Sequence, residues 1–545
     1  MNELSPIDAQ IMWSRLISVV DEQAQTLIRT AFSPIVRECG DISAGIFDIE
    51  GRMLAQAVTG TPGHVNSMAE SVKHFLDRFP AAEMQPGDIY ITNDPWMGTG
   101  HLNDFVLTTP AFYKGRLVAL FSCTSHLMDI GGIGFGPDAT DIFMEGLSIP
   151  FLKLAEGGQM NETLLAMIRA NTRLPVDTEG DVYSLAACND IGVVRLQHMM
   201  EEFGLETLDA LAAHILDRSR AAVLAEIAEL PQGRWENTMV VDGYAAPVTL
   251  AVAVTVSETG IHVDYTGTSP QVARGINVPL SYATAYTVFG LSCIVGSRVP
   301  NNAGSLAPLT VSAPEGSIVN ALKPAPVSSR HIIGQMMPDV VFGALRHAIP
   351  DRVPAEGTSC LWNLNVRGVA EKGVSGNYGF TMAVTANGGT GARPGKDGMS
   401  ATAYPSGVKG TPVEIAEAVT PLVFWRKELR ADSGGAGRTR GGLGQRIEIE
   451  SRIGEPFDLL AAYDRIDHPA RGRDGGQDGA AGRVSLASGQ TLRGKGFQLI
   501  PPGERLVVET PGGGGIGAPE ERSRDRVADD IAAGLVTGAG AAAYD

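Results

Sequence analysis

The sequence predicts an α+β protein of several domains. Three observations support this prediction. The chain has 545 residues, more than one domain usually contains. Helical and strand patterns occupy separate stretches instead of alternating, which disfavours a doubly wound parallel sheet. Glycine makes up 28 of the 130 residues from 388 to 517. We therefore expect an N-terminal mixed α/β region (1–235), a central β-rich region with helical segments (236–385) and a glycine-rich, β-containing C-terminal region (386–545).

The N-terminal region opens with a helical pattern over residues 8–32, where apolar residues recur at helical spacing. Short strands with turn signals follow at 46–48 and 89–92, and residues 117–123 form a nearly continuous apolar strand. Residues 160–229 are then predicted to be mainly helical.

The central region begins with alternating residues from 238 to 268, typical of a β-hairpin. Residues 245–256 are apolar and rich in Val and Thr, which favours a buried strand over a helix. The glycines from 388 to 517 predict tight turns or irregular loops between short strands. A final helix is expected at about 520–533.

Composition excludes several classes of protein. The formal net charge is −18, so a nucleic-acid partner is not expected. The chain lacks the roughly 18 consecutive apolar residues of a membrane span. No basic residue precedes Arg15, so we do not expect a secretory signal peptide. We expect a cytoplasmic location instead. The five scattered cysteines include no CxxC pair, which indicates reduced thiols.

The sequence lacks the HExxH, GxSxG and Walker A motifs; Gly395 and Lys396 are followed by Asp397, where a P-loop needs Ser or Thr. Residues 512–517 formally satisfy GxGxxG. Only 28 residues follow them, too few for the rest of a βαβ unit. We therefore expect neither ATP nor a dinucleotide to bind through these loops, and interpret residues 512–517 as a mobile or backbone-packing loop.

Histidines and acidic residues gather in the first quarter of the chain. His101 and Asp104 are three residues apart, so a tight loop or helical turn would place them on one side. His126 follows the apolar strand at 117–123, and Asp41 and His64 lie upstream. Two imidazoles with one or two carboxylates suit Zn²⁺, Mn²⁺ or Fe²⁺. The alternative is that these are ordinary hydrogen-bonded residues in glycine-rich loops.

A series of motifs begins with Asp41, the His101–Asp104 pair and residues 126–132 and continues along the chain. In their order these motifs resemble the hydantoinase B / 5-oxoprolinase family, the beta-type subunit of ATP-dependent cyclic amide hydrolases, and the resemblance spans essentially the whole chain. Further matches are Arg173 with Gly180 and Asp181, residues 275–279, 300–304 and 313–317, Arg330 with His331, residues 412–417, 432–437 with Arg440, and 510–515.

The resemblance implies a heteromeric enzyme. A hydantoinase A-like partner would bind ATP and Mg²⁺ and phosphorylate a hydantoin, 5-oxoproline or lactam, in an α2β2 or larger assembly. This chain would hold one divalent transition metal (Zn, Mn or Fe) and deliver metal-activated water. Two alternatives stay open: a subunit of an ATP-dependent acetone or acetophenone carboxylase, and a non-catalytic scaffold for the ATPase subunit.

The expected metal ligands are Asp41, His101, Asp104 and His126. Asp129 is expected to orient His126 or to replace Asp104 as a ligand.

Four further residues are each open to two interpretations, and a fifth is assigned to packing. His64 and His331 are candidates for proton transfer or for binding phosphate or substrate, with plain pocket histidines as the alternative. Arg173 and Arg330 could bind an anion or form structural ion pairs. Cys39 is interpreted as a packed residue.

Three residues depart from the family pattern. They are Asn66, Asn103 and Met128, and we expect all three to line the site and to bear on the identity of the substrate.

Overall fold

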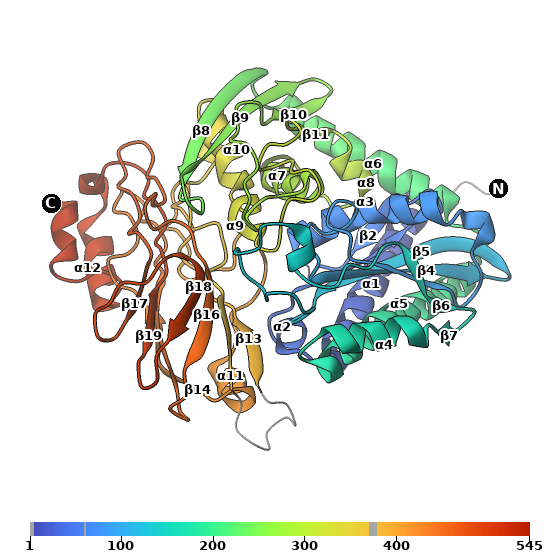
Figure 1. The fold of residues 1–545 in the computed structure, drawn as a ribbon. Coiled ribbons are helices and arrows are strands. Elements are labelled where there is room, and N and C mark those ends of the chain that lie inside the picture. The colour runs from blue at the N-terminus through green and yellow to red at the C-terminus, as the bar shows by residue number, and fades with distance from the viewer. Residues whose placement is uncertain (1–4, 59–60, 370–378) are drawn as a thin grey trace.

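The computed structural model describes residues 5–58, 61–369 and 379–545 (Figure 1). Its N-terminal part is an antiparallel seven-stranded sheet in the order β2-β1-β5-β4-β3-β6-β7. The strands are β1 (Ile42–Phe47), β2 (Met53–Gln56), β3 (Ile89–Thr92), β4 (Asp104–Tyr113), β5 (Arg116–His126), β6 (Leu152–Glu156) and β7 (Gln159–Met160).

Helices cover both faces of this sheet (Figure 1). One face carries α1 (Pro6–Thr30) and α5 (Pro175–Phe203), and the other carries α3 (Pro62–Arg78). The α1 helix begins where the Ser5 side chain accepts a hydrogen bond from the amide of Asp8, as helix caps do. The remaining N-terminal helices are α2 (Pro34–Arg37), α4 (Glu162–Asn171) and α6 (Asp209–Ala228). The predicted helical stretches at 8–32 and 160–229 are confirmed.

The central part is a four-stranded sheet in the order β11-β10-β9-β8, covered by helices (Figure 1). Its strands are β8 (Gly233–Val241), β9 (Val248–Ser257), β10 (Gly260–Asp264) and β11 (Leu309–Ser312). The helices are α7 (Leu280–Val295), α8 (Ala303–Leu306), α9 (His331–Gly334) and α10 (Met337–Leu345). β8 and β9 form the predicted hairpin.

The C-terminal part holds two antiparallel four-stranded sheets, ordered β13-β12-β16-β18 and β14-β15-β19-β17. Their strands are β12 (Leu364–Gly368), β13 (Phe380–Val384), β14 (Leu422–Leu429), β15 (Gln445–Ser451), β16 (Phe457–Ala462), β17 (Arg483–Leu486), β18 (Lys495–Ile500) and β19 (Leu506–Glu509). The helices are α11 (Val413–Val419) and α12 (Arg524–Ala532). One apolar core runs from Val223 to Val508, so the central and C-terminal parts pack together.

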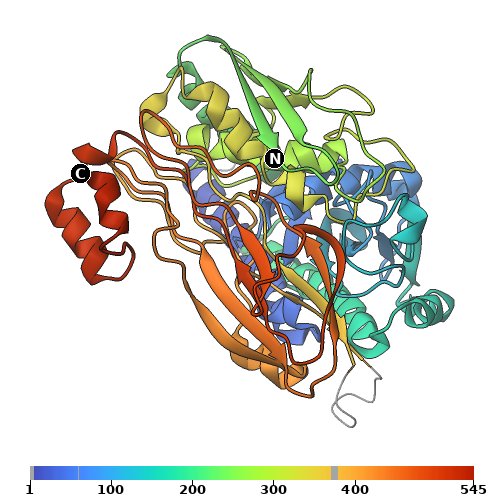
Figure 2. The ribbon, with the colours of Figure 1, turned by 60° about the vertical axis from the view of Figure 1, so that its left-hand side comes forward.

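The glycine-rich segments lie side by side and bond through their backbones (Figure 2). The amide of Gly435 donates to the carbonyl of Gly513 (2.8 Å), and the amide of Gly513 donates to the carbonyl of Gly442 (3.0 Å). A Cβ atom on Gly441 would collide with the carbonyl oxygen of Gly513. These segments are irregular loops between short strands, one of the two forms predicted, and their glycines permit a close approach of backbones that the sequence did not predict.

The Gly512–Gly517 run belongs to this packing, since the amide of Gly515 donates to the carbonyl of Gln477 (2.9 Å). Of the two expected alternatives, it is the backbone-packing loop.

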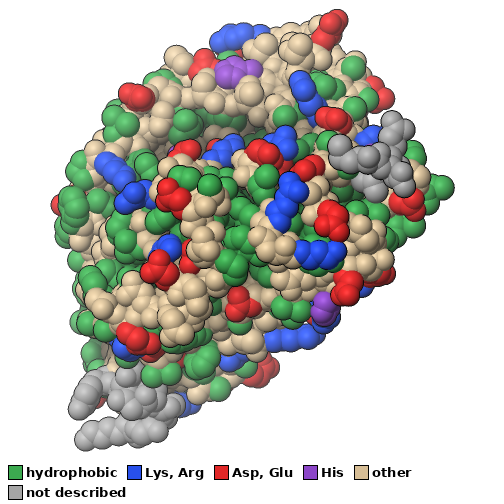
Figure 3. All heavy atoms as spheres, turned by 90° about the vertical axis from the view of Figure 1, so that its right-hand side faces the viewer, with side chains coloured by type: hydrophobic (Ala, Val, Ile, Leu, Met, Phe, Trp, Pro, Cys, Tyr) green, Lys and Arg blue, Asp and Glu red, His purple; other side chains and the backbone are tan. Residues whose placement is uncertain are grey.

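Acidic and basic side chains are interspersed on the face shown in Figure 3. Within the described residues, no helix is both long and apolar enough to cross a membrane.

Candidate metal centre

A β-hairpin brings the central pair of residues together. β4 begins at Asp104, β5 ends at His126, and the register of the two strands sets these residues directly opposite each other. His101 lies in the loop that leads into β4, three residues before Asp104. The spacing of 22 residues between Asp104 and His126 is therefore the length of one hairpin, and the strands are a rigid mount for both side chains.

Three ligand-type atoms form a small triangle in the interior. His101 Nε2 lies 2.7 Å from Asp104 Oδ1, and His126 Nδ1 lies 3.2 Å from that oxygen and 3.3 Å from His101 Nε2. Neighbouring ligands on a tetrahedral zinc ion are roughly 3.3 Å apart, given bonds of about 2.0–2.1 Å. All three side chains are buried, with exposed fractions of 2% for His101, 0% for Asp104 and 3% for His126. The triangle could hold a metal ion.

The chemistry of His101 supports a cation at this place. Its Nδ1 lies 2.9 Å from the carbonyl oxygen of Ser328, which can only accept, so the ring proton is on Nδ1. Burial, reinforced by the Arg330 guanidinium, lowers the pKa of His101 to about 3, so the ring is neutral. Its Nε2 then offers a lone pair 2.7 Å from a carboxylate oxygen, and a cation bound between the two atoms would relieve their repulsion.

Asp104 remains a carboxylate although it is fully buried. Burial alone would raise its pKa, but the basic groups of His64 and Arg330 outweigh this, and the pKa lies well below its usual range. Its Oδ2 accepts a hydrogen bond from Arg330 Nη2 (2.5 Å) and lies 3.0 Å from His64 Nε2. Asp104 thus turns one oxygen to the triangle and the other to two basic groups.

Asp41 and His64 adjoin the triangle. His64 stands in the first turn of α3, and its Nδ1 lies 3.5 Å from Asp41 Oδ1. Burial would lower the pKa of His64, but the carboxylates of Asp104 and Asp41 raise it overall. The Thr61 hydroxyl also donates to Asp41 Oδ1 (3.0 Å). Asp41 therefore contacts His64 and not the three atoms of the triangle.

A cavity of about 30 Å³ lies at the cluster, room for a water molecule. Its wall includes Asp41, His64, His101, His126 and His331. His126 Nε2 and His331 Nε2 are buried without a hydrogen-bond partner in the described protein. Unpaired buried nitrogens are costly, so they fit a site that takes a polar ligand.

Asp129 has a different place from the one expected. Its Oδ1 accepts from Arg173 Nη1 (2.6 Å), and its Oδ2 accepts from the Thr172 hydroxyl (3.0 Å) and from the Arg173 amide. These bonds tie the loop after β5 to the start of α5. These contacts show that the expectation that Asp129 orients His126 or replaces Asp104 is wrong. The ion-pair partner of Asp129 is Arg173.

The remaining candidate residues also have definite places. Arg330 is an ion-pair partner of Asp104 and stacks over the Tyr282 ring, 4.0 Å from its centroid. Burial lowers the pKa of His331 well below its usual range, which makes this cavity histidine neutral. Cys39 contacts the hydroxyls of Thr385 and Thr411 and is buried, and burial raises the pKa of its thiol.

Two residues important to the site have no signal in the local sequence. Ser328 contributes only its carbonyl, and Glu145 Oε1 holds the amides of Val327 and Ser328 at 2.7 and 2.8 Å. Burial raises the pKa of Glu145 to about 8. Only the pairing of segments some 180–230 residues apart reveals either role.

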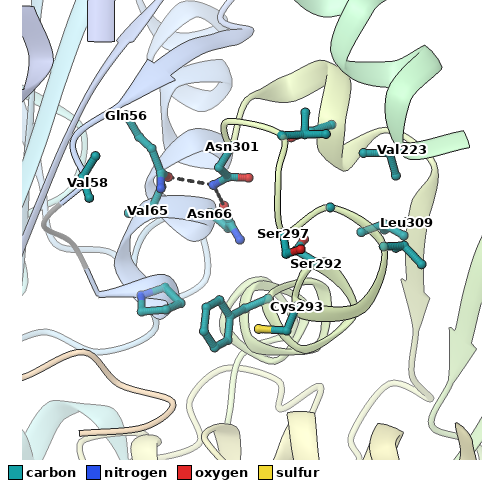
Figure 4. A pocket seen from close by; sticks show the side chains of 16 residues that line it. Gln56, Val58, Val65, Asn66, Val223, Ser292, Cys293, Ser297, Asn301 and Leu309 are labelled. Carbon is teal, nitrogen blue, oxygen red and sulfur yellow. Dashed lines mark hydrogen bonds between the residues drawn. The ribbon is translucent and has the colours of Figure 1, made fainter. Parts of the chain in front are cut away.

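Asn66 does not line the cavity at the histidine cluster. It borders a larger hollow of about 390 Å³ around the first turns of α3 and the end of α7, and Figure 4 shows it with Gln56 and Asn301. Asn301 Nδ2 donates to Gln56 Oε1 (2.7 Å) and to Asn66 Oδ1 (2.9 Å). Asn103 instead bonds the carbonyl of Leu127, and Met128 borders a narrow gap beyond the cavity. The expectation that all three line the site is wrong.

Comparison with known proteins decides the family. The model of the hydantoinase B/oxoprolinase family matches residues 5–519. The chain belongs to this family. Hydantoinase B-type relatives match it along nearly their whole length: a Pseudomonas sp. protein named as part of a putative D-/L-hydantoinase is 31% identical over 98% of this chain and 94% of its own. The beta subunit of the caprolactamase of Pseudomonas jessenii is 28% identical, covering 98% of this chain and 95% of its own.

A solved structure shares the fold. The crystal structure of the ATP-dependent caprolactamase from Pseudomonas jessenii superposes with a TM-score of 0.89 at 27% identity, covering 100% of this chain and 96% of that chain. This match confirms the α+β class predicted from the sequence. The 5-oxoprolinase 1 of Arabidopsis thaliana is longer, since the chain spans only 42% of it.

Proposed function

We propose that this hydantoinase B-family chain is the metal-binding component of an ATP-dependent cyclic amide hydrolase. The observation that carries the proposal is the buried triangle of His101, Asp104 and His126, in which a bare imidazole nitrogen faces a carboxylate oxygen. The family and the likeness to caprolactamase supply the class of substrate, a hydantoin, 5-oxoproline or lactam.

His101 Nε2, Asp104 Oδ1 and His126 Nδ1 would hold one divalent ion, with Zn, Mn and Fe suited to this donor set. When bound, such an ion polarises oxygen atoms and lowers the pKa of water to near 7. Asp41 lies beside the cluster through His64 and is an additional donor within reach of the same cavity.

The protein's own residues orient this chemistry. The Ser328 carbonyl fixes the tautomer of His101, and Arg330 holds Asp104 by its second oxygen. The carboxylates of Asp104 and Asp41 raise the pKa of His64, which suits this ring to hold a proton and to pass it to the ring nitrogen that leaves. Neutral His331 accepts hydrogen bonds in the same cavity.

A partner protein would supply the energy. An opened small ring holds its amine and carboxyl close together, at effective molarities that can reach ~10⁵–10⁸ M, so re-closure is favoured without a coupled reaction. We propose that a hydantoinase A-like partner takes up ATP and Mg²⁺ and phosphorylates the amide, in an α2β2 or larger assembly. Two relatives are named as subunits, which supports a partner.

The test is reconstitution with the partner. ATP cleavage and ring-opened product are measured together against hydantoins, lactams and ketones, with and without bicarbonate, after metal analysis of the chain. We expect about one divalent transition metal per chain, no ATP cleavage by the chain alone, and product from a cyclic amide without bicarbonate. Bicarbonate-dependent turnover of a ketone would assign a carboxylase instead, and full activity without metal would leave the chain a scaffold.

A further inference from the structure

Three hollows adjoin one another between the surface and the histidine cluster. A pocket of about 470 Å³ is bordered by Arg173, Arg367 and Thr381, and these residues also border a narrow gap of about 10 Å³. Phe135 borders both this gap and the 30 Å³ cavity at the cluster. The larger hollow of Figure 4 shares no lining residue with that cavity among the described residues.

One face of β12 runs along this series. Asn363 borders the cluster cavity, Asn365 the gap, and Arg367 the gap and the outer pocket. Asn365 and Arg367 are alternate residues of β12 and share one face, and Asn363 lies immediately before the strand. Arg367 Nη1 donates to the carbonyl of Ile133 (2.9 Å), which directs that face towards the loop that carries Phe135.

The asparagines on this face are unpaired. Both amide atoms of Asn365 are buried without a hydrogen-bond partner in the described protein, and so is Oδ1 of Asn363. The two side chains are only 4% and 6% exposed. A buried amide without partners destabilises a fold, so its presence indicates a ligand that supplies them.

The charges at the outer pocket are balanced. Arg173 pairs with Asp129 at 2.6 Å, and Arg367 pairs with Asp458 at 2.9 Å. A pocket built for a phosphate would leave its arginines free, so this mouth favours a ligand without net charge. Asn365 offers one donor and one acceptor side by side, and a phosphate group could satisfy only the donor.

We propose that Asn363, just before β12, and the Asn365–Arg367 face of β12 are the wall of the route between the surface and the histidine cluster, with Phe135 at its narrowest point. When Phe135 turns aside and widens the gap of about 10 Å³, Asn365 pairs there with a ligand that carries an N–H donor and a carbonyl-type acceptor on one edge. A ring amide has this edge because its amide is held cis. The ring-opened amino acid, a zwitterion, also presents both groups. The identity of the amide rests on the proposed function, whereas the route does not.

The first experiment measures access to the cluster without catalysis. In the metal-loaded complex, removal of the metal by the chelator dipicolinate is followed for the wild type, Phe135→Trp and Phe143→Trp. Phe143 is 80% exposed in the same loop and serves as the control. We expect Phe135→Trp to slow metal removal at least tenfold and Phe143→Trp to leave it unchanged. Equal rates for all three would overturn the route.

The second experiment measures ligand pairing with Asn365→Leu, which keeps the volume and removes both polar atoms. Binding of 2-pyrrolidinone and of 4-aminobutyrate is titrated by NMR in the same complex. We expect Asn365→Leu to bind one of the two compounds at least tenfold more weakly than the wild type does. Weaker binding of 2-pyrrolidinone identifies the ligand as the entering amide, and weaker binding of 4-aminobutyrate identifies it as the leaving amino acid. The Tm of the variant should equal or exceed that of the wild type. A lower Tm with unchanged binding would show a structural asparagine and overturn the pairing.

The two proposals fail separately. If no ring is opened but Phe135→Trp still slows metal removal, the route stands and the hydrolase proposal fails. If rings are opened and both Phe135→Trp and Asn365→Leu behave as the wild type, the hydrolase proposal stands and the route fails.

Discussion

Asp104 links the whole cluster, because its two oxygens face different neighbours. Oδ1 belongs to the triangle with His101 and His126, and Oδ2 contacts Arg330 and His64. A buried carboxylate with so many basic neighbours is costly to disturb, since removing any partner leaves charge unpaired.

Replacing His126 with alanine should abolish ring opening without unfolding the protein. The side chain is at the end of β5, whose apolar packing does not need the imidazole, and loss of a ligand should cost more than the 10–100-fold typical of residues that only orient ligands. Metal content, phosphate release and ring-opened product are measured in the reconstituted complex. Asp129→Asn is the comparison, expected to keep its metal. Normal product per ATP in His126→Ala would refute the assigned role.

Glu145 should make stability depend on pH. Burial raises its pKa from 4.5 to about 8, so between these values the folded protein holds a proton that the unfolded chain has released. The contribution of protonated Glu145 to the free energy of unfolding is therefore complete below pH 4.5 and is lost as the pH rises through 8. This contribution is on the order of a few kcal/mol.

The check is thermal unfolding of Glu145→Gln and the wild type from pH 5 to pH 9. Glutamine keeps the acceptor for the amides of Val327 and Ser328 and cannot ionise. The variant should gain in Tm relative to the wild type as the pH rises. If the Tm values of the variant and the wild type changed with pH in parallel, the raised pKa of Glu145 would be ruled out.

For individual residues, the sequence predicted which side chains gather in the triangle better than it predicted the contacts of their neighbours. The His101–Asp104 spacing and the position of His126 after a strand are local patterns, and the structure brings those residues together. Asp129 has an equally suitable side chain, but its carboxylate turns towards Thr172 and Arg173. That direction depends on where α5 begins, which no pattern near Asp129 contains.

Among the elements, the first turn of α3 fits closely against α7. A Cβ atom on Gly63 would lie 2.5 Å from the Tyr286 ring and 2.6 Å from the Tyr282 ring. The next residue is His64, so this contact sets how deeply the histidine reaches towards Asp104.

Gly63→Ala should push α3 outwards and weaken metal binding. Overpacking of this kind typically costs about 1–3 kcal/mol of stability. The matched control on the same helix is Glu70→Ala, whose side chain is 55% exposed and which should change stability by no more than about 0.5 kcal/mol. Unfolding and metal titration are measured for both. Wild-type metal affinity in Gly63→Ala would contradict this account of the helix.

Helices and buried strands were predictable because their periodicity is local. The helix predicted at 8–32 spans Pro6–Thr30, and the strand predicted at 117–123 extends to His126. The irregular loops of the glycine-rich segments were predicted, but their close packing was not, because a glycine that makes a turn and a glycine that admits another backbone look the same in the sequence. Only the position of the neighbouring segment distinguishes them.

In the molecule as a whole, the glycine segments are a core held by backbone hydrogen bonds. Gly441→Ala should destabilise the protein by about 1–3 kcal/mol, because the new methyl group meets the carbonyl of Gly513. Gly538→Ala is the control, since a Cβ atom there would meet nothing within 4 Å. Chemical unfolding compares the two variants, and similar stabilities would show that the segments separate easily.

The metal cluster is assembled from distant parts of the chain. Ser328 and Arg330 contact His101 and Asp104 across 227 and 226 positions, and the cavity wall extends to Val408. During synthesis, the hairpin with its ligand-type side chains leaves the ribosome long before the residues that set the His101 tautomer and neutralise Asp104. A nascent chain that ends before Ser328 would therefore carry the donor atoms without their orientation. Under the proposed function, metal loading accordingly belongs to the completed chain, which takes up the ion after translation rather than during it.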